Sequence, residues 1–510
     1  MDRNKKIYYF VQCAADSNVG LIGLACLLAS CMLLASGFFL FKNTAYFDDS
    51  FIYLHMAANI VEQGTARYFP IVDSSLLLSS SPLRLLTLVP GFFVLDIFNI
   101  PLRTIESARF AFLCSGFVAF LCFVPFWKNR LQLYLFTGAV FFLMGTSLDS
   151  IFLMEGGVLF FSLFTLVKLL TERSENYFVI GIAIILVGLS RPEIGAISVV
   201  SVLLMCMNDR RAIVQLVLGI LFAFSIYWAL MLALGVYPIP STIWSKQITG
   251  KLKLFSDKNL IEVLPLSIAH IMGFSWPWVG WGFIALPAVF SLSLARGAVP
   301  ILSAVVLLLI VAISMPGNFV WYSENFLIAL FALSVVVVVE SYRRGMVKVA
   351  SMLGVVILVA FLLTLHENFG KNKIYPWNEN SPGYLAYKEV GSGSIDNGRF
   401  IIRRYSNEPV RLRMCEIGLV SYFSGPNAWI YDVCGLVQIG NLKGASQSWL
   451  RYIYPSSFVE TGDDQLMRFK DNNTTPVIDV WALRNKEEAL GAVGKCKFVD
   501  EIFCINEYKR

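Results

Sequence analysis

Long apolar runs separated by short polar segments fill the first 365 residues of the chain. The first run, Gly20 to Phe41, follows a basic start at Asp2 to Lys6. At about 1.5 Å per residue it reaches ~33 Å, which is enough to cross a bilayer. The run is too long for a signal-peptide core and lacks a small-residue cleavage site. We therefore expect it to remain in the protein as a membrane span.

Further apolar stretches predict a polytopic bundle of helices. Basic residues collect in the cytoplasmic loops of membrane proteins. With the N-terminus in the cytoplasm, Lys128 to Arg130 lies on the cytoplasmic side only if 82–98 or 107–127 does not cross the membrane fully. About eleven crossings result, which leaves residues 42–81 as the first outer loop and places everything after Leu365 outside. The stretches are 82–98, 107–127, 133–146, 151–170, 177–189, 194–207, 212–234, 264–294, 299–315, 326–340 and 347–365.

The pattern changes near His366, where Asn, Gly, Ser and charged residues become frequent. Short apolar runs bounded by Gly, Pro or Asn predict strands at Arg399 to Arg403, Trp429 to Val433 and Pro476 to Val480. A helix is expected at Lys486 to Val493. The predicted architecture is therefore mainly α, with a transmembrane domain over 1–365 and a small α/β soluble domain over 366–510.

Composition supports the membrane class. Hydrophobic residues make up 57% of the chain and charged residues 15%, whereas soluble proteins carry about a quarter charged residues. The net charge of +6 is modest, and no basic run is long enough to suggest nucleic acid. We expect membrane lipid, and no nucleic acid, as a partner.

Cysteine usage fits the predicted compartments. Six of the ten cysteines (13, 26, 31, 114, 122 and 206) lie in or near spans, where thiols behave as small apolar groups. The other four lie in the outer domain, where an even number permits two disulfides. We expect Cys496–Cys504 and Cys415–Cys434, with four free thiols as the alternative. Because the chain has three histidines and no CxxC, we expect no metal site.

Asp48 and Asp49 are adjacent carboxylates just outside the first span. Neighbouring residues point in different directions, so one could face a reaction centre while the other caps a helix. That helix is predicted over Phe51 to Val61 and could lie on the membrane surface. A partly desolvated carboxylate near the bilayer suits general-base chemistry. The plainer interpretation is that both carboxylates only cap and solvate a helix start.

Other charged residues collect on the same predicted outer side. Charges are costly in hydrocarbon, so each should pair or face a polar cavity. A cavity with carboxylates and cations suits a phosphate leaving group, because the cations stabilise the departing anion while a carboxylate deprotonates a hydroxyl. Single interfacial charges are the alternative, and we favour it for Arg84 and Glu155. The full set is Arg84, Asp149, Glu155, Arg191, Glu193 and Lys246.

Aromatic residues cluster at Trp276 to Trp281 and at Trp321-Tyr322. An aromatic belt at the membrane interface is the favoured interpretation. A wall on which a sugar ring stacks is the sharper alternative.

Motifs on the predicted outer side, in order, resemble membrane-embedded GT-C glycosyltransferases of the arabinofuranosyltransferase-like branch. In the tail, Glu416 to Phe423 followed by Ile430 to Leu436 is similar to the branch's "GxxxYyt…viDlxGL". The sequence departs from the pattern where Leu148-Asp149 replaces Met-Glu. The remaining motifs are Phe47 to Tyr53 ("DDAYI"), Ser79 to Leu83 ("YTSPL"), Gly145 to Asp149 ("TGMET"), Leu189 to Glu193 ("LTRPE") and Pro240 to Lys246 ("PNTxxxK").

The resemblance implies an inverting transfer of a sugar from a polyprenyl-phosphate donor. Asp48 or Asp49 would be the base, with Asp48 slightly favoured. The donor phosphate would bind near Lys246, Arg191 and Arg84. Substrate contacts are expected from Tyr53, Asp149, Glu155, Glu193, Trp321 and Tyr322. No cofactor is expected, although a divalent cation stays open.

The resemblance also implies a multi-pass protein of the bacterial cytoplasmic (inner) membrane with its tail on the periplasmic side. The sugar would be arabinofuranose on branch resemblance, with aminoarabinose, mannose and other hexoses open. The acceptor would be an envelope glycan or a surface protein. A transporter or flippase of lipid-linked intermediates is the chief alternative, although no internal repeat is visible. A non-catalytic envelope assembly protein is the second.

Overall fold

In the computed structural model the chain divides into two compact units. Unit 1 combines Met1–Thr44, Phe112–Ile226 and Ser256–Ser381, and unit 2 combines Ala45–Ala111, Tyr227–Phe255 and Pro382–Arg510. The residues that the structure describes are 48–70, 76–123, 156–171, 176–242, 410–414, 417–426, 428–432, 478–482, 497–500 and 503–507.

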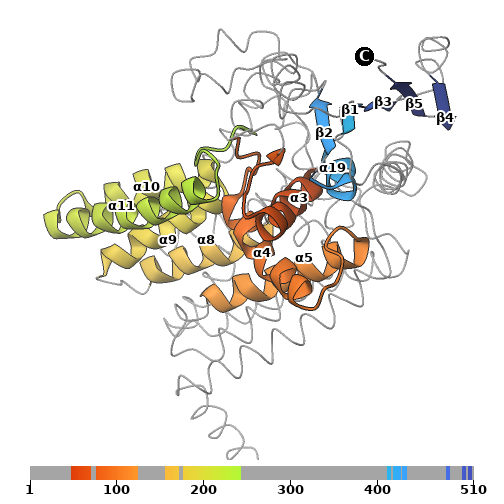
Figure 1. Cartoon of the computed structure of the whole chain (residues 1–510). Coiled ribbons are helices and arrows are strands. Elements are labelled where there is room, and N and C mark those ends of the chain that lie inside the picture. Colours follow the sequence, from red (N-terminus) through yellow and green to blue (C-terminus); the bar gives the residue numbers. More distant parts are fainter. Residues whose placement is uncertain are drawn as a thin grey trace, which may run out of the picture. The chain divides into compact units, whose positions relative to one another are not determined.

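The described part of unit 1 consists of helices that pack alongside one another. Figure 1 shows α8 (Gly156–Thr171), α9 (Tyr177–Ser190), α10 (Pro192–Cys206) and α11 (Arg210–Ala233) lying alongside one another. Side chains cap the helix starts, where backbone N–H groups lack partners. Asn176 accepts from the N–H of Val179 at 3.2 Å, and Asp209 accepts from the N–H of Ala212 at 3.1 Å.

The chain breaks between α9 and α10 at Arg191-Pro192. A residue before proline avoids the helical region, and Arg191 is extended, with φ −152° and ψ 109°. Its N–H still bonds the carbonyl of Val187 at 2.8 Å, and its own carbonyl accepts from Gly195 at 3.0 Å. One residue therefore ends α9 and starts α10, and its side chain is 2% exposed.

Glycines bring α9 and α11 into backbone contact. A Cβ added to Gly219 would lie 2.1 Å from the carbonyl oxygen of Phe178, and one added to Gly181 would lie 2.5 Å from that of Leu216. Small residues at such crossings are typical of membrane helix pairs, where close packing drives association.

Helix α11 is the one helix in the described part of the chain that is long and apolar enough to cross a membrane. Its 24 residues span about 36 Å. Leu218, Leu221, Phe222 and Ile226 on it are each more than half exposed. A buried core helix would cover such side chains, so this apolar face is suited to lipid.

Unit 2 is built around α3 (Asp48–Gln63). Every residue from Ser50 to Asn59 is buried, on all sides of the helix. The helix expected over Phe51 to Val61 is therefore confirmed, and its place relative to the membrane stays a prediction. Helices α4 (Pro82–Ile97) and α19 (Gly418–Ser424) pack against α3, so protein covers its apolar side chains.

Local signals set the bounds of α4 (Pro82–Ile97), which α5 (Ile105–Phe123) follows. Ser81 caps α4 and proline occupies its first turn. The end is a Schellman motif, in which Asn99 has φ 55° and Ile100 donates to the carbonyl of Leu95 at 3.0 Å.

Five described strands of the tail form one mixed sheet. They are β1 (Val410–Met414), β2 (Ala428–Asp432), β3 (Ile478–Ala482), β4 (Lys497–Asp500) and β5 (Phe503–Glu507), in the order β2-β1-β3-β5-β4. Strand β1 pairs in parallel with β2 and β3, while β5 pairs antiparallel with β3 and β4. Helix α19 (Gly418–Ser424) makes the crossover from β1 to β2.

The apolar pattern located the described helices well. Elements α4, α5, α8, α9, α10 and α11 match the stretches expected at 82–98, 107–127, 151–170, 177–189, 194–207 and 212–234. Strands β2 and β3 overlap two expected runs. The eleven crossings, the domain bounds 1–365 and 366–510, and both disulfides stay predictions. The first span, the strand at Arg399 to Arg403, the helix at Lys486 to Val493, and Cys415, Cys434 and Cys496 lie outside the described residues.

Candidate functional site

Asp48 and Asp49 are the first two residues of α3. A helix N-terminus stabilises nearby negative charge. At about 100° per residue, Asp48 shares a face of α3 with His55 and Asn59, whereas Asp49 shares a face with Tyr53. The described side chains show that these two faces lead to two separate polar clusters.

The cluster on the Asp49 face is built from hydroxyl groups and one guanidinium. The hydroxyl oxygens of Tyr53 and Ser80 are 2.6 Å apart. Tyr53 also interacts electrostatically with Arg84, whose side chain is 1% exposed. A buried guanidinium needs anionic or polar surroundings. This position therefore suits an anionic ligand.

A second chain segment joins this cluster from the end of α11. Ser241 donates from its N–H to the carbonyl of Leu77 at 2.9 Å, so residues 240–242 run beside 76–80. Ser79 is fully buried and Thr242 is 7% exposed. Neither hydroxyl has a hydrogen-bond partner among the described residues. Buried hydroxyls without partners are costly, so these two are candidates to bind a ligand. Tyr53, Ser79, Ser80, Arg84 and Thr242 are called the hydroxyl cluster below.

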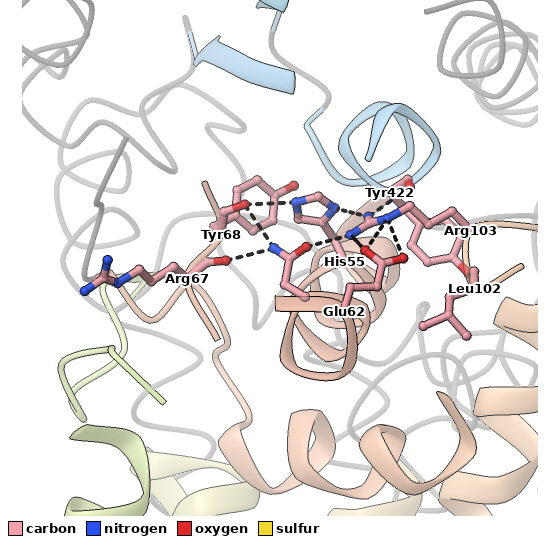
Figure 2. A network of polar contacts seen from close by, with 8 residues as sticks. His55, Glu62, Arg67, Tyr68, Leu102, Arg103 and Tyr422 are labelled. Atoms are coloured by element: carbon pink, nitrogen blue, oxygen red, sulfur yellow. Dashed lines mark hydrogen bonds and ion pairs between the residues drawn. The ribbon is translucent and has the colours of Figure 1, made fainter. Parts of the chain in front are cut away.

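The cluster on the Asp48 face is centred on Arg103, between α4 and α5 (Figure 2). Its Nη2 donates to Asn59 Oδ1 at 2.6 Å and to Glu62 Oε2 at 2.7 Å. Its Nη1 donates to His55 Nδ1 at 2.9 Å and to the carbonyl oxygen of Tyr422 at 3.1 Å. One guanidinium thus binds three positions along α3 and one in α19. These five residues are called the Arg103 cluster.

Hydrogen bonding fixes the state of His55. A guanidinium only donates, so Nδ1 must accept and Nε2–H must donate to the carbonyl of Tyr68, 2.9 Å away. The ring is therefore neutral. Burial first, and the charge of Arg103 second, hold the pKa of His55 well below 6.5. The bonding pattern and the direction of the pKa shift agree.

Tyr422 is locked as a hydrogen-bond donor. Its hydroxyl donates to the carbonyls of Leu102 and Thr104, the residues on either side of Arg103. Burial raises the pKa of Tyr422, so the phenol stays protonated at physiological pH. Phe51 of α3 packs against the Tyr422 ring with centroids 5.3 Å apart.

The structure brings some predicted site residues together and leaves others untested. Asp48, Asp49, Tyr53 and Arg84 all belong to unit 2. Arg191 belongs to unit 1, so its expected place beside the donor phosphate stays a prediction. Glu193 is the second residue of α10, and the description does not extend to its side chain. Asp149, Glu155, Lys246, Trp321 and Tyr322 lie outside the described residues.

Sequence reasoning missed the Arg103 cluster. His55, Asn59 and Glu62 are spaced i, i+4, i+7, so their shared helical face was a usable signal. Arg103 itself stands in Pro101 to Thr104 without a motif around it. Its partner Tyr422 lies 319 residues away, which no local pattern could indicate.

The chain shares its fold with ArnT from Cupriavidus metallidurans. The crystal structure of ArnT bound to undecaprenyl phosphate matches with a TM-score of 0.52 at 11% identity, over 95% of this chain and 97% of that one. The apo structure matches with the same TM-score and coverage at 13% identity. No protein-family model and no curated protein matches the sequence. The likeness shows a fold shared with ArnT. Membership of the GT-C superfamily and of its arabinofuranosyltransferase-like branch stays a prediction.

Proposed function

We propose that this protein is a GT-C glycosyltransferase that moves a sugar from a polyprenyl phosphate to an acceptor at the outer face of the bacterial cytoplasmic membrane. The observation that carries the proposal is the position of the carboxylate pair. Asp48 and Asp49 begin a buried helix, in a fold matching a protein crystallised with undecaprenyl phosphate. Fold alone does not fix function, so the chemistry of the site has to support it.

The carboxylate pair supplies the base. In the proposed step, one Asp takes the proton of the acceptor hydroxyl while the acceptor oxygen bonds to the anomeric carbon. The bond from that carbon to the phosphate oxygen breaks, and polyprenyl phosphate leaves with its electron pair. The anomeric centre inverts. The step balances with no other reactant, and the carboxylate afterwards releases its proton to water.

The hydroxyl cluster would hold the donor. A leaving phosphate gains most from cationic and hydrogen-bonding groups that are fixed beforehand. Arg84 of α4 is buried near Tyr53 of α3, and Ser79 and Thr242 offer buried hydroxyls. Lys246 and Arg191 are proposed to add charge at the same phosphate.

The cluster also bears on which carboxylate is the base. Asp49, rather than Asp48, shares the face of α3 that carries Tyr53, and Tyr53 contacts Ser80. The opposite face is occupied by the Arg103 cluster, which is filled by its own hydrogen bonds. This arrangement favours Asp49, whereas the resemblance in sequence slightly favoured Asp48.

The sugar and the acceptor are proposed from sequence resemblance alone. Arabinofuranose leads as the sugar, and an envelope glycan or surface protein is the acceptor. Asp149, Glu155, Glu193, Trp321 and Tyr322 are proposed to contact these substrates. The tail sheet would lie on the periplasmic side.

The test is transfer by the purified full-length protein in lipid nanodiscs. Donors are a panel of undecaprenyl-phosphate sugars that includes arabinofuranose, aminoarabinose and mannose, each labelled in the sugar, with envelope extract as acceptor. Release of undecaprenyl phosphate together with label in the acceptor supports the proposal. Movement of intact donor across sealed vesicles, with no transfer from any donor, would instead support the flippase alternative.

A further inference from the structure

Resting on the proposed function, we infer that Arg103 and the tail helix α19 form a clasp that positions α3, and with it the carboxylate pair, for transfer. Arg103 and Tyr422 are positioning residues in this account, since neither is placed against substrate. The tail would thus be needed for the chemical step, in addition to any part it has in holding the acceptor.

The clasp is reciprocal. The side chain of Arg103 donates to the backbone carbonyl of Tyr422, and the side chain of Tyr422 donates to the backbone carbonyls of Leu102 and Thr104. Each residue therefore fixes the backbone that carries the other. Two short segments that are distant in sequence are locked in one geometry.

The clasp binds α3 through three side chains of that helix. Arg103 binds His55, Asn59 and Glu62, which span two turns of the helix (Figure 2). The side chain of Arg103 is 9% exposed and that of Glu62 is 25% exposed. The bonds of Arg103 to His55 and Asn59 are part-buried, whereas its ion pair with Glu62 is exposed. The more shielded bonds should resist competition from water better than the exposed pair.

Aromatic contacts extend the grip to the first turn of α3. Phe51 stands two residues after Asp49, and its ring lies 5.3 Å from that of Tyr422 and 5.8 Å from that of Phe423. Tyr68 donates to the carbonyl of Ile417, the residue before α19, at 2.9 Å. The tail thus holds the end of α3 at which Asp48 and Asp49 stand.

Two variants of the full-length protein test the clasp. Arg103→Lys keeps the charge but cannot reach four partners at once. Tyr422→Phe keeps the ring and removes the hydroxyl. Arg67→Lys is the matched control, because Arg67 belongs to the same unit and its Nε donates to the Gly235 carbonyl at 3.0 Å.

Two readouts separate positioning from folding. Amide hydrogen exchange over residues 48–63 should quicken by about tenfold in Arg103→Lys and less in Tyr422→Phe. In Arg103→Lys, kcat should fall by up to about a hundredfold, as for a small misplacement of a catalytic group. The KM for the donor should stay close to that of wild type. Arg67→Lys should change neither quantity.

Either of two results would overturn the clasp: unchanged α3 exchange in both variants, or faster exchange with an unaltered kcat. If Arg103→Lys fails to fold, the exchange and kcat of Tyr422→Phe alone test the clasp. If the wild type transfers no sugar, the proposed function fails, and α3 exchange alone decides whether Arg103 and α19 hold the helix.

Discussion

Gly188 and Gly195 face each other across the turn between α9 and α10, but their contact is asymmetric. A Cβ on Gly195 would lie 2.3 Å from the Cα of Gly188, whereas a Cβ on Gly188 would lie 3.6 Å from the Cα of Gly195. The first distance is a clash with backbone, and the second is ordinary van der Waals contact. The same substitution should therefore change stability by different amounts at the two positions.

We predict that Gly195→Ala destabilises the protein by about 1–3 kcal/mol, as overpacking does. Gly188→Ala should be close to neutral, since alanine is also the better helix former. Thermal unfolding of both variants in the same detergent measures the difference. Equal melting temperatures would contradict the close approach of the two helices.

Acid should weaken unit 2 through His55. Its pKa is lowered in the folded protein, so below pH 6.5 the unfolded chain binds more protons than the folded one. The stability from this group is complete above pH 6.5 and falls as pH drops towards the folded pKa, by about 1.4 kcal/mol per pH unit.

The check is the melting temperature of wild type and His55→Gln at about pH 7.5 and about pH 5.5. Glutamine cannot titrate, so the loss of stability between the two pH values should be smaller in the variant. Identical losses would mean that His55 is not held neutral by burial and Arg103.

Ser79→Ala should separate stability from function. The buried hydroxyl has no partner among the described residues, so removing it should leave the protein at least as stable as wild type and could raise the free energy of unfolding by about 1 kcal/mol. If that hydroxyl binds the donor, affinity for undecaprenyl phosphate should fall by about tenfold. Measuring unfolding and equilibrium binding on one preparation tests both the predicted stability and the predicted affinity. A large loss of stability with normal binding would show that Ser79 bonds within the protein instead.

Arg84 offers a graded test of the donor site. Arg84→Lys keeps the cation, and Arg84→Gln removes it. We expect the KM for the donor to rise by about tenfold or more in Arg84→Gln and by less in Arg84→Lys, because bonds to charged groups are the stronger ones. Arg67→Gln serves as the control for losing an arginine from unit 2. If all three variants have the same KM for the donor as the wild type, Arg84 does not bind the donor.

Local chemistry explains which parts of this fold the sequence could predict. Ser81-Pro82, Asn176 and Arg191-Pro192 mark helix boundaries through bonds and steric limits within a few residues, so the apolar runs they flank were placed correctly. Nothing in these signals depends on distant parts of the chain.

The burial of α3 depends on contacts that no local pattern contains. The sequence indicated a helix over Phe51 to Val61 that could lie on the membrane surface. In the structure its polar residues His55 and Asn59 bond Arg103, and Phe51 packs against α19. Residues from distant segments therefore enclose the helix. The carboxylate pair was recognisable from sequence, but the clasp that holds its helix was not.

The central claim is that a carboxylate of α3 is the base for transfer from a polyprenyl-phosphate sugar. The most direct test is transfer by Asp48→Asn and Asp49→Asn, compared with wild type at saturating donor, with folding checked by melting temperature. We predict that kcat falls by at least about a hundredfold in Asp49→Asn and clearly less in Asp48→Asn, while both variants stay folded. Full transfer by both folded variants would contradict the account.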